Sequence, residues 1–210
     1  GTGADTLIGG DGSDVIDGGS GADTLLGGSG SDTLIGGGGA DVVDGGEGAD
    51  LLELDGSAGV TAEGGDGTDT VVLVGETNEA SLSGVEVVVG SAGDDSVTVS
   101  TNDIASVSGG AGIDDVTLTD ASGNTVDLAG VEVIAGSAGD DILTVTDDTS
   151  VTVDGGDGSD TLTGNVGDDT LIGGTGADTL IGGGGADFVD GGQGSDLLEL
   201  DGSAGVTAEG

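Results

Sequence analysis

The sequence predicts an all-β chain wound as a solenoid, and two observations lead to this fold class. The pattern Gly-Gly-x-Gly-x-Asp-x-apolar-x runs five times without interruption over residues 9–53. A fixed short period of this kind is typical of solenoids, in which each repeat forms one unit that stacks on the next. Within each repeat, a glycine-rich turn is followed by a short apolar or β-branched stretch such as residues 24–26, which favours a strand.

The nonapeptide assigns a physical role to each of its positions. Glycines at positions one, two and four permit positive φ and close backbone approach, so the first six residues suit a tight turn. Strand side chains alternate, so position eight points inward while positions seven and nine face outward. The position-six aspartate then lies in a turn beside carbonyl oxygens, and an oxygen-only cage suits Ca²⁺. In the first block the inward residues are Leu7, Ile16, Leu25, Leu34, Val43 and Leu52, and the aspartates are Asp5, Asp14, Asp23, Asp32, Asp41 and Asp50.

These repeats carry a family resemblance. The copies GGDGSDVID, GGSGADTLL and GGSGSDTLI resemble the calcium-binding nonapeptides of the RTX (repeats-in-toxin) family. The resemblance implies a right-handed parallel β-roll in which two nonapeptides make one coil and Ca²⁺ sits between stacked turns. It places Asp5, Asp23 and Asp41 on one edge, with the alternate aspartates on the other. Right-handedness also follows the general preference of parallel crossovers.

Composition indicates that cations are part of the fold. The 210 residues include 42 acidic groups, no Lys, Arg or His, and 52 Gly, which gives a formal charge of −42. Like-charge repulsion and the entropy of glycine are expected to keep a metal-free chain expanded. Nucleic acid is excluded as a partner because phosphate contacts need Lys and Arg. No apolar run approaches the roughly 20 residues of a membrane helix, so membrane insertion is not expected.

The residue types present also argue against catalysis. The chain has no His, Cys, Lys or Tyr, and so it lacks the usual bases and nucleophile partners. Paired carboxylates recur identically along the chain, which fits metal ligands better than one glycosidase pair. We therefore expect no enzymatic activity in this segment.

The chain divides into three predicted segments. Residues 1–64 form a calcium-dense β-roll block, residues 65–154 form a Val- and Thr-rich solenoid with sparser calcium turns, and residues 155–210 form a second dense block. Residues 28–64 match residues 174–210 at an offset of 146, with 5 differences in 37 positions. Residues 65–210 therefore constitute one 146-residue unit of a tandem array, preceded by the end of another.

The middle segment has a repeat of its own. Residues 81–99 match residues 127–145 at an offset of 46, which is five nonapeptides plus one residue. Two of its turns, at residues 90–95 and 136–141, replace the second glycine with serine and so depart from the family pattern. We expect alternating valines to share one buried face here, namely Val85, Val87, Val89, Val131 and Val133.

The candidate calcium ligands are the position-six aspartates of all recognisable copies. Further ligands are expected to be backbone carbonyls, as the resemblance implies. Beyond the six aspartates of the first block, the candidates are Asp69, Asp95, Asp114, Asp141, Asp160, Asp169, Asp178, Asp187 and Asp196.

The function predicted is that of a calcium-dependent structural segment, extracellular or on the cell surface. It would fold on Ca²⁺ after secretion and build a fibre, stalk or surface layer, associating with itself end to end or laterally. The family resemblance implies type I secretion. One alternative is a secretion and folding module of a toxin, protease or lipase. Another is an adhesive or ice-binding solenoid, which needs a flat ladder of identical outward side chains.

Overall fold

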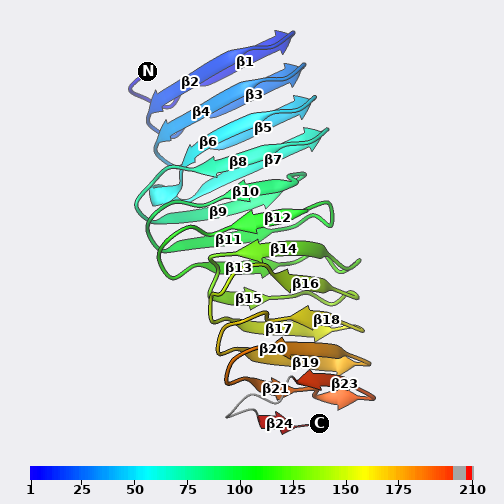
Figure 1. Ribbon diagram of the computed structural model, residues 1–210. Helices are drawn as coiled ribbons and strands as arrows, with labels where there is room; N and C mark the ends of the chain where they lie inside the picture. The colour runs from blue at the N-terminus through cyan, green and yellow to red at the C-terminus, as the bar shows by residue number, and fades with distance from the viewer. Residues whose placement is uncertain (201–206, 210) are drawn as a thin grey trace.

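The chain folds as an all-β parallel solenoid. A computed structural model describes residues 1–200 and the strand at 207–209, and its strands stack coil upon coil with the termini at opposite ends (Figure 1). Within these residues the strands form one 13-stranded and one 11-stranded sheet, and from β1 to β21 successive strands alternate between the two. Two strands make one turn, so the solenoid has about 11 turns.

The larger sheet contains the odd-numbered strands from β1 to β21, together with the short strands β22 and β24. Every pairing within it is parallel, as in β1 with β3 and β3 with β5. Its strands are β1 (Thr6–Asp11), β3 (Thr24–Ser29), β5 (Val42–Glu47), β7 (Val60–Asp66), β9 (Asn78–Ser83), β11 (Asp95–Val99), β13 (Asp115–Leu118), β15 (Val133–Ala135), β17 (Thr152–Asp157), β19 (Thr170–Gly176), β21 (Phe188–Asp190), β22 (Gln193–Gly194) and β24 (Thr207–Glu209).

The smaller sheet runs alongside it. Its strands are β2 (Val15–Ser20), β4 (Thr33–Gly38), β6 (Leu51–Asp55), β8 (Thr70–Leu73), β10 (Val87–Val89), β12 (Ser106–Ser108), β14 (Thr125–Ala129), β16 (Ile142–Val145), β18 (Thr161–Thr163), β20 (Thr179–Gly183) and β23 (Leu197–Leu200). Among the described residues the only helical element is the 3₁₀ turn η1 (Gly56–Ala58). No helix in that part of the chain is long and apolar enough to cross a membrane.

The core is a thin column between the two sheets, and its width changes along the chain. In strands β1 to β5 one apolar side chain per strand points inward, and Leu25 and Leu34 are fully buried. In β2 the next inward position is Gly18, which adds no side chain. In the central strands β11, β13, β14 and β16 two apolar side chains point inward, as with Val97 and Val99 in β11, whereas β10, β12 and β15 place one inward. The centre therefore buries more apolar surface per coil, while the dense blocks depend more on their turns.

The prediction that alternating valines share a buried face is wrong for the middle segment. Val85 is buried, but Val87 is half-buried and Val89 is 38% exposed, because Val88 points inward instead. Val88 pairs with the inward residues Val71 and Val107 on the neighbouring strands, and this register fixes the alternation. The second copy behaves alike, since Val131 and Ile134 are buried whereas Val133 is 40% exposed.

The three predicted segments are continuous parts of one pair of sheets. The register advances by 18 residues per coil in the first block, where Leu7 pairs with Leu25. It varies further along the chain, since Ala62 pairs with Leu82 across a longer coil and Ala80 pairs with Val97 across a shorter one. Residues 201–206 and 210, which belong to the predicted third segment, lie outside the described residues.

Truncating an inward residue should destabilise the calcium-loaded solenoid. For Leu162→Ala, whose side chain is fully buried in β18, we expect a loss of about 2–5 kcal/mol in the free energy of unfolding. The matched control Ile142→Ala, at a side chain that is 46% exposed, should cost below about 1 kcal/mol. Denaturant unfolding at saturating calcium measures both, and equal losses would contradict the assigned core.

Candidate calcium sites

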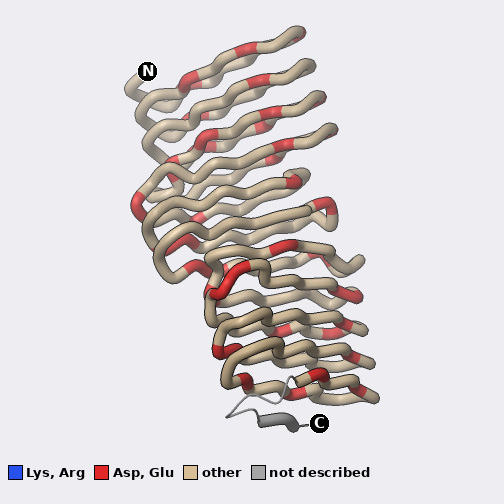
Figure 2. The backbone as a smooth tube through the Cα atoms, viewed as in Figure 1, with Lys and Arg blue, Asp and Glu red and all other residues tan. Residues whose placement is uncertain are grey.

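The position-six aspartates stack in ladders along the two edges of the solenoid. The backbone N–H of Asp14 donates to Oδ1 of Asp32 at 2.8 Å, and that of Asp32 donates to Oδ1 of Asp50 at 2.7 Å. On the other edge, Asp5 donates in the same way to Asp23 at 2.7 Å. The two alternate series therefore follow separate ladders, as predicted. Figure 2 shows acidic residues recurring along the whole column.

Most of these aspartates are buried, which is unusual for carboxylates. The first turn and the last are less covered, since Asp5, Asp14 and Asp196 are half-buried. The remaining candidates are at most 3% exposed: Asp23, Asp32, Asp41, Asp50, Asp69, Asp95, Asp114, Asp141, Asp160, Asp169, Asp178 and Asp187.

Eleven of the candidate aspartates have one buried oxygen without a hydrogen-bond partner in the described part of the chain. Oδ1 accepts the N–H of the preceding coil, whereas Oδ2 is buried and unpaired. An unpaired buried charge is costly unless a cation or a proton compensates it. The chain has no Lys, Arg or His to serve as that cation. The unpaired Oδ2 atoms belong to Asp14, Asp23, Asp32, Asp41, Asp50, Asp69, Asp114, Asp160, Asp169, Asp178 and Asp187.

Glycine at position one leaves room for the unpaired oxygen. A Cβ on Gly27 would lie 2.5 Å from Oδ2 of Asp32 and 2.4 Å from the carbonyl oxygen of Gly45 in the next coil. The same holds at Gly45, where a Cβ would lie 2.5 Å from both Oδ2 of Asp50 and the carbonyl oxygen of Gly64. A carboxylate oxygen and a carbonyl oxygen from successive coils thus border one space that any side chain would fill.

Glycines at positions two and four let successive turns stack closely. Gly28 and Gly30 have φ of 116° and 126°, in the region that side chains disfavour. A Cβ on either would lie 2.2 Å from a carbonyl oxygen of the coil before, at Gly10 and Gly12 respectively. The turn geometry that the sequence predicts is therefore present.

The oxygen donors fit calcium. Among the described residues no group of three or more acidic side chains is placed to hold a metal ion. Backbone carbonyl oxygens would therefore have to complete the coordination that an aspartate begins. Hard carboxylate and carbonyl oxygens in an irregular arrangement match the preference of Ca²⁺. When bound, Ca²⁺ would supply the positive charge that the unpaired Oδ2 atoms lack.

Burial raises the pKa of the ladder aspartates. The pKa values of Asp160 and Asp169 rise to about 6, first because burial disfavours the charged form and then because neighbouring carboxylates repel it. A backbone N–H bond opposes this rise in each case. The same burial also raises the pKa values of Asp41, Asp50, Asp69, Asp114 and Asp178.

Two predicted sites differ from the others. Asp95 and Asp141 are buried, but both oxygens of each carboxylate accept hydrogen bonds from the protein. Their donors include Asn78 and Asn124, which the sequence analysis did not single out. The available signal was the 46-residue repeat, because it relates these two asparagines to each other.

Glutamates take the aspartate position where two ladders end. The backbone N–H of Asp69 donates to Oε2 of Glu86 at 2.6 Å, and that of Asp114 donates to Oε2 of Glu132 at 2.8 Å. These glutamates precede short strands and belong to no nonapeptide turn, so the repeat pattern did not predict their role. The same 46-residue offset relates them.

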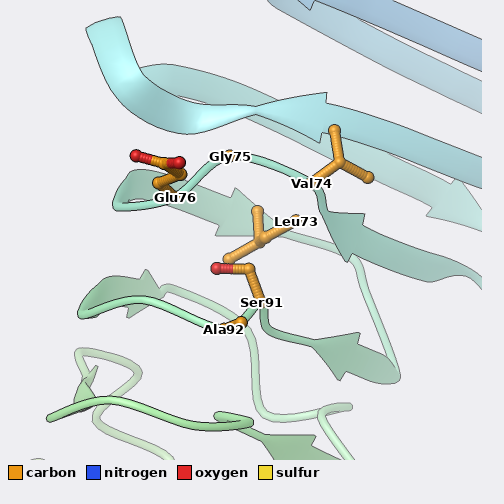
Figure 3. A pocket seen from close by; sticks show the side chains of 6 residues that line it. All are labelled: Leu73, Val74, Gly75, Glu76, Ser91 and Ala92. Carbon is orange, nitrogen blue, oxygen red and sulfur yellow. The ribbon is translucent and has the colours of Figure 1, made fainter.

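A hollow of about 730 Å³ lies beside the turn at residues 90–95, in which serine replaces the second glycine. It is lined by Leu73, Val74, Gly75, Glu76, Ser91 and Ala92. In Figure 3 the side chains of Leu73 and Ser91 lie near each other, whereas the Glu76 carboxylate points away from them. Since the lining contains a single carboxylate, the hollow offers no pair of acid and base groups.

Stacked glycine turns with buried aspartates, joined by short parallel strands, define a calcium-binding repeat solenoid. The sequence profile of the RTX calcium-binding nonapeptide repeat matches residues 1–34, 17–52, 26–60, 82–100, 128–149, 150–171 and 163–198. These segments cover more than half of the chain, and the chain belongs to the family of RTX calcium-binding nonapeptide repeats. No curated protein matches the chain significantly.

A methyl group at position one should damage a calcium turn. Gly27→Ala would crowd Asp32 and the next coil, whereas Gly38 has nothing within 4 Å of an added Cβ. Neither glycine has positive φ, so only the available space differs. We expect Gly27→Ala to cost about 1–3 kcal/mol in the calcium-loaded state and to raise the calcium midpoint of folding, with Gly38→Ala unchanged. Circular dichroism during calcium titration measures this, and identical titrations would contradict the assigned turn geometry.

Acid should stabilise the calcium-free fold. Because the folded-state pKa of Asp160 and Asp169 is about 6 against an ordinary 3.8, the folded chain binds more protons than the unfolded chain between these values. Stability of the calcium-free solenoid should therefore rise as the pH falls from 7 through about 6 towards 4.

Calcium should reverse this trend, because protons then compete with the bound ion. Far-ultraviolet circular dichroism on chelator-dialysed and calcium-loaded chain between pH 4 and 8 checks both. A calcium-free β signal that weakened on acidification would show that the buried carboxylates do not control folding.

Proposed function

We propose that this chain is a calcium-dependent structural segment that works outside the cell. It folds when calcium binds after secretion and forms part of a fibre, stalk or surface layer. The observation that carries the proposal is the row of buried, unpaired carboxylate oxygens in a chain with no basic side chain. Membership of the RTX repeat family supports calcium as the compensating cation.

Folding on calcium follows from the charge of the ladders. Without the ion, each dense coil would bring an unpaired carboxylate close to the carboxylates of its neighbours, while burying one apolar side chain per strand. Calcium binding supplies folding free energy directly when the site does not exist in the unfolded chain. An extracellular module needs only weak affinity, on the order of 10⁻⁴ to 10⁻³ M. A low-calcium cytosol would then keep the chain unfolded for export.

The repeat organisation supports a structural array. A 146-residue unit at 65–210 follows the end of a closely similar unit, and a solenoid grows by adding coils that contact only their neighbours. We therefore propose that residues 1–64, 65–154 and 155–210 alternate dense, sparse and dense calcium turns along a longer rod. A secretion module attached to an enzyme requires only one short block.

The outer surface supports lateral contact between rods more than adhesion. Exposed aliphatic side chains on the outer faces include Ile8, Val15 and Val42, which are 69%, 78% and 51% exposed. Such residues offer apolar contacts to a second copy. The adhesive or ice-binding alternative needs an unbroken outward ladder of identical side chains. Thr6 pairs with Thr24, but Thr24 then pairs with Val42 rather than with a third threonine.

Calcium titration with two readouts tests the proposal. Circular dichroism on chain 1–210 should show a cooperative transition from coil to β structure at sub-millimolar to millimolar Ca²⁺, reversed by chelator. Light scattering recorded on the same samples should rise with the transition if rods assemble.

Each departure from this result has its own meaning. A calcium-driven transition with no scattering would favour the secretion and folding module over the assembling rod. A β signal that chelator leaves unchanged throughout the chain would overturn calcium-dependent folding.

A further inference from the structure

The second position of the turn takes two backbone conformations. Where it is glycine in the dense blocks, φ is positive, as in Gly10 at 110° and Gly28 at 116°. Asn165, the one described non-glycine residue with positive φ, occupies the same position at 81°. Ser91 and Ser137, which replace glycine at this position in the middle segment, do not have positive φ.

The pairing of the aspartate follows this conformation. In all eleven described turns whose aspartate has a buried and unpaired Oδ2, position two has positive φ, and the turn of Asn165 and Asp169 is one of them. At the two serine turns, the backbone N–H of the serine donates to Oδ2, at 2.7 Å for Asp95 and 2.8 Å for Asp141. The conformation of position two, rather than the presence of glycine, thus separates turns with an unpaired oxygen from turns without one.

Asparagine completes the serine turns from the preceding coil. Nδ2 of Asn78 donates to Oδ1 of Asp95 at 2.6 Å and to Oγ of Ser91 at 3.1 Å. Both Asn78 and Asp95 are at most 4% exposed. In the dense ladders this place belongs to another aspartate, which donates only its backbone N–H. The asparagine therefore adds donors and removes one negative charge.

The arrangement occurs twice. Nδ2 of Asn124 donates to Oδ1 of Asp141 at 2.8 Å and to Oγ of Ser137 at 3.2 Å. All three residues stand 46 positions after their counterparts in the first cluster. The second cluster leaves only the uncharged Oδ1 of Asn124 without a partner.

We propose that the clusters Asn78–Ser91–Asp95 and Asn124–Ser137–Asp141 are metal-free turns that keep the centre of the solenoid folded when calcium is absent. Amide, hydroxyl and backbone donors satisfy these buried carboxylates, which removes the need for a cation. Several central strands, such as β11 and β14, also bury two apolar side chains each, so the central coils depend less on their turns. This inference rests on the proposed calcium dependence of the other turns.

With a folded centre, calcium-driven folding would proceed outward from the centre towards both ends of the solenoid. Coils of a solenoid form most readily on a coil that is already folded. The centre, from β9 to β16, would present a template at both ends, on which the dense blocks wind as calcium rises. The chain would then respond to calcium in two stages, with a persistent centre and switchable flanks.

Hydrogen exchange on chain 1–210, with calcium and with chelator, tests the inference. In chelator we expect β11, β14 and β16 to stay protected at least tenfold longer than β2, β4 and β20, and calcium should protect all of them. If the centre exchanges as fast as the flanks in chelator while calcium protects both, the proposal of metal-free turns is wrong and the proposed calcium-dependent function stands. If chelator changes no segment, the calcium function itself is wrong.

Charge-adding variants identify the donors responsible. Asn78→Asp with Asn124→Asp replaces two amides by carboxylates, and we expect central protection in chelator to fall at least tenfold and to return with calcium. Asn102→Asp adds one carboxylate at an exposed residue of the same segment and should leave the centre protected. Equal protection of the centre from hydrogen exchange in the double variant and in this control, both in chelator, would overturn the proposal. The measurement with calcium shows that each variant can fold.

Substitutions at position two test the backbone part. Ser91→Gly with Ser137→Gly permits positive φ and should increase the calcium bound per chain, whereas Asn165→Ser should reduce it. Equilibrium dialysis with calcium measures the bound ion directly. Unchanged binding in both variants would show that the conformation of position two does not select metal turns.

Discussion

The structure depends on a hydrogen bond that repeats from coil to coil, between the backbone N–H of one aspartate and the carboxylate of the next. This bond fixes Oδ1, as between Asp160 and Asp178 at 2.8 Å, and it draws the charged group out of water. Burial strengthens this bond, and it also raises the free-energy cost of leaving Oδ2 without a partner. The fold therefore requires a positive partner for this carboxylate. The glycines at positions one, two and four provide the space around the carboxylate and the backbone conformation that its turn requires.

The nonapeptide pattern was sufficient to predict the solenoid, the inward residues and the two aspartate ladders. This success has a physical cause, since period, glycine placement and strand alternation all act within nine or eighteen residues. Leu25 and Leu34 are buried where position eight predicts them. Asp23 and Asp32 lie on separate ladders because an 18-residue coil contains two nonapeptides, which places successive repeats on opposite edges.

Other features depend on contacts that the pattern does not contain. Val87 and Val89 alternate as a half-buried strand should, yet Val88 faces the core because its neighbours in register fix the alternation. The asparagine clusters join residues that are 13 and 17 positions apart, across turns of unequal length. Ser91 was recognised as a departure from the pattern, but its effect on Asp95 is set by backbone conformation, which the residue type alone does not specify.

Interruptions of the ladders also organise the charge of the molecule. Asn78 and Asn124 each stand at the start of a ladder. Glu86 and Glu132 each accept the last N–H of a ladder, and the ladder that Glu132 ends is the one that Asn78 begins. A long uninterrupted row of unpaired carboxylates would add repulsion with every coil, because each buried charge lies close to the next. Dividing the row into short ladders separates these charges, and neutral asparagines at the junctions replace a demand for calcium with hydrogen bonds. The two serine turns of the middle segment thus hold buried aspartates without a cation, whereas Asp69 and Asp114 in the same segment keep an unpaired oxygen like those of the dense blocks.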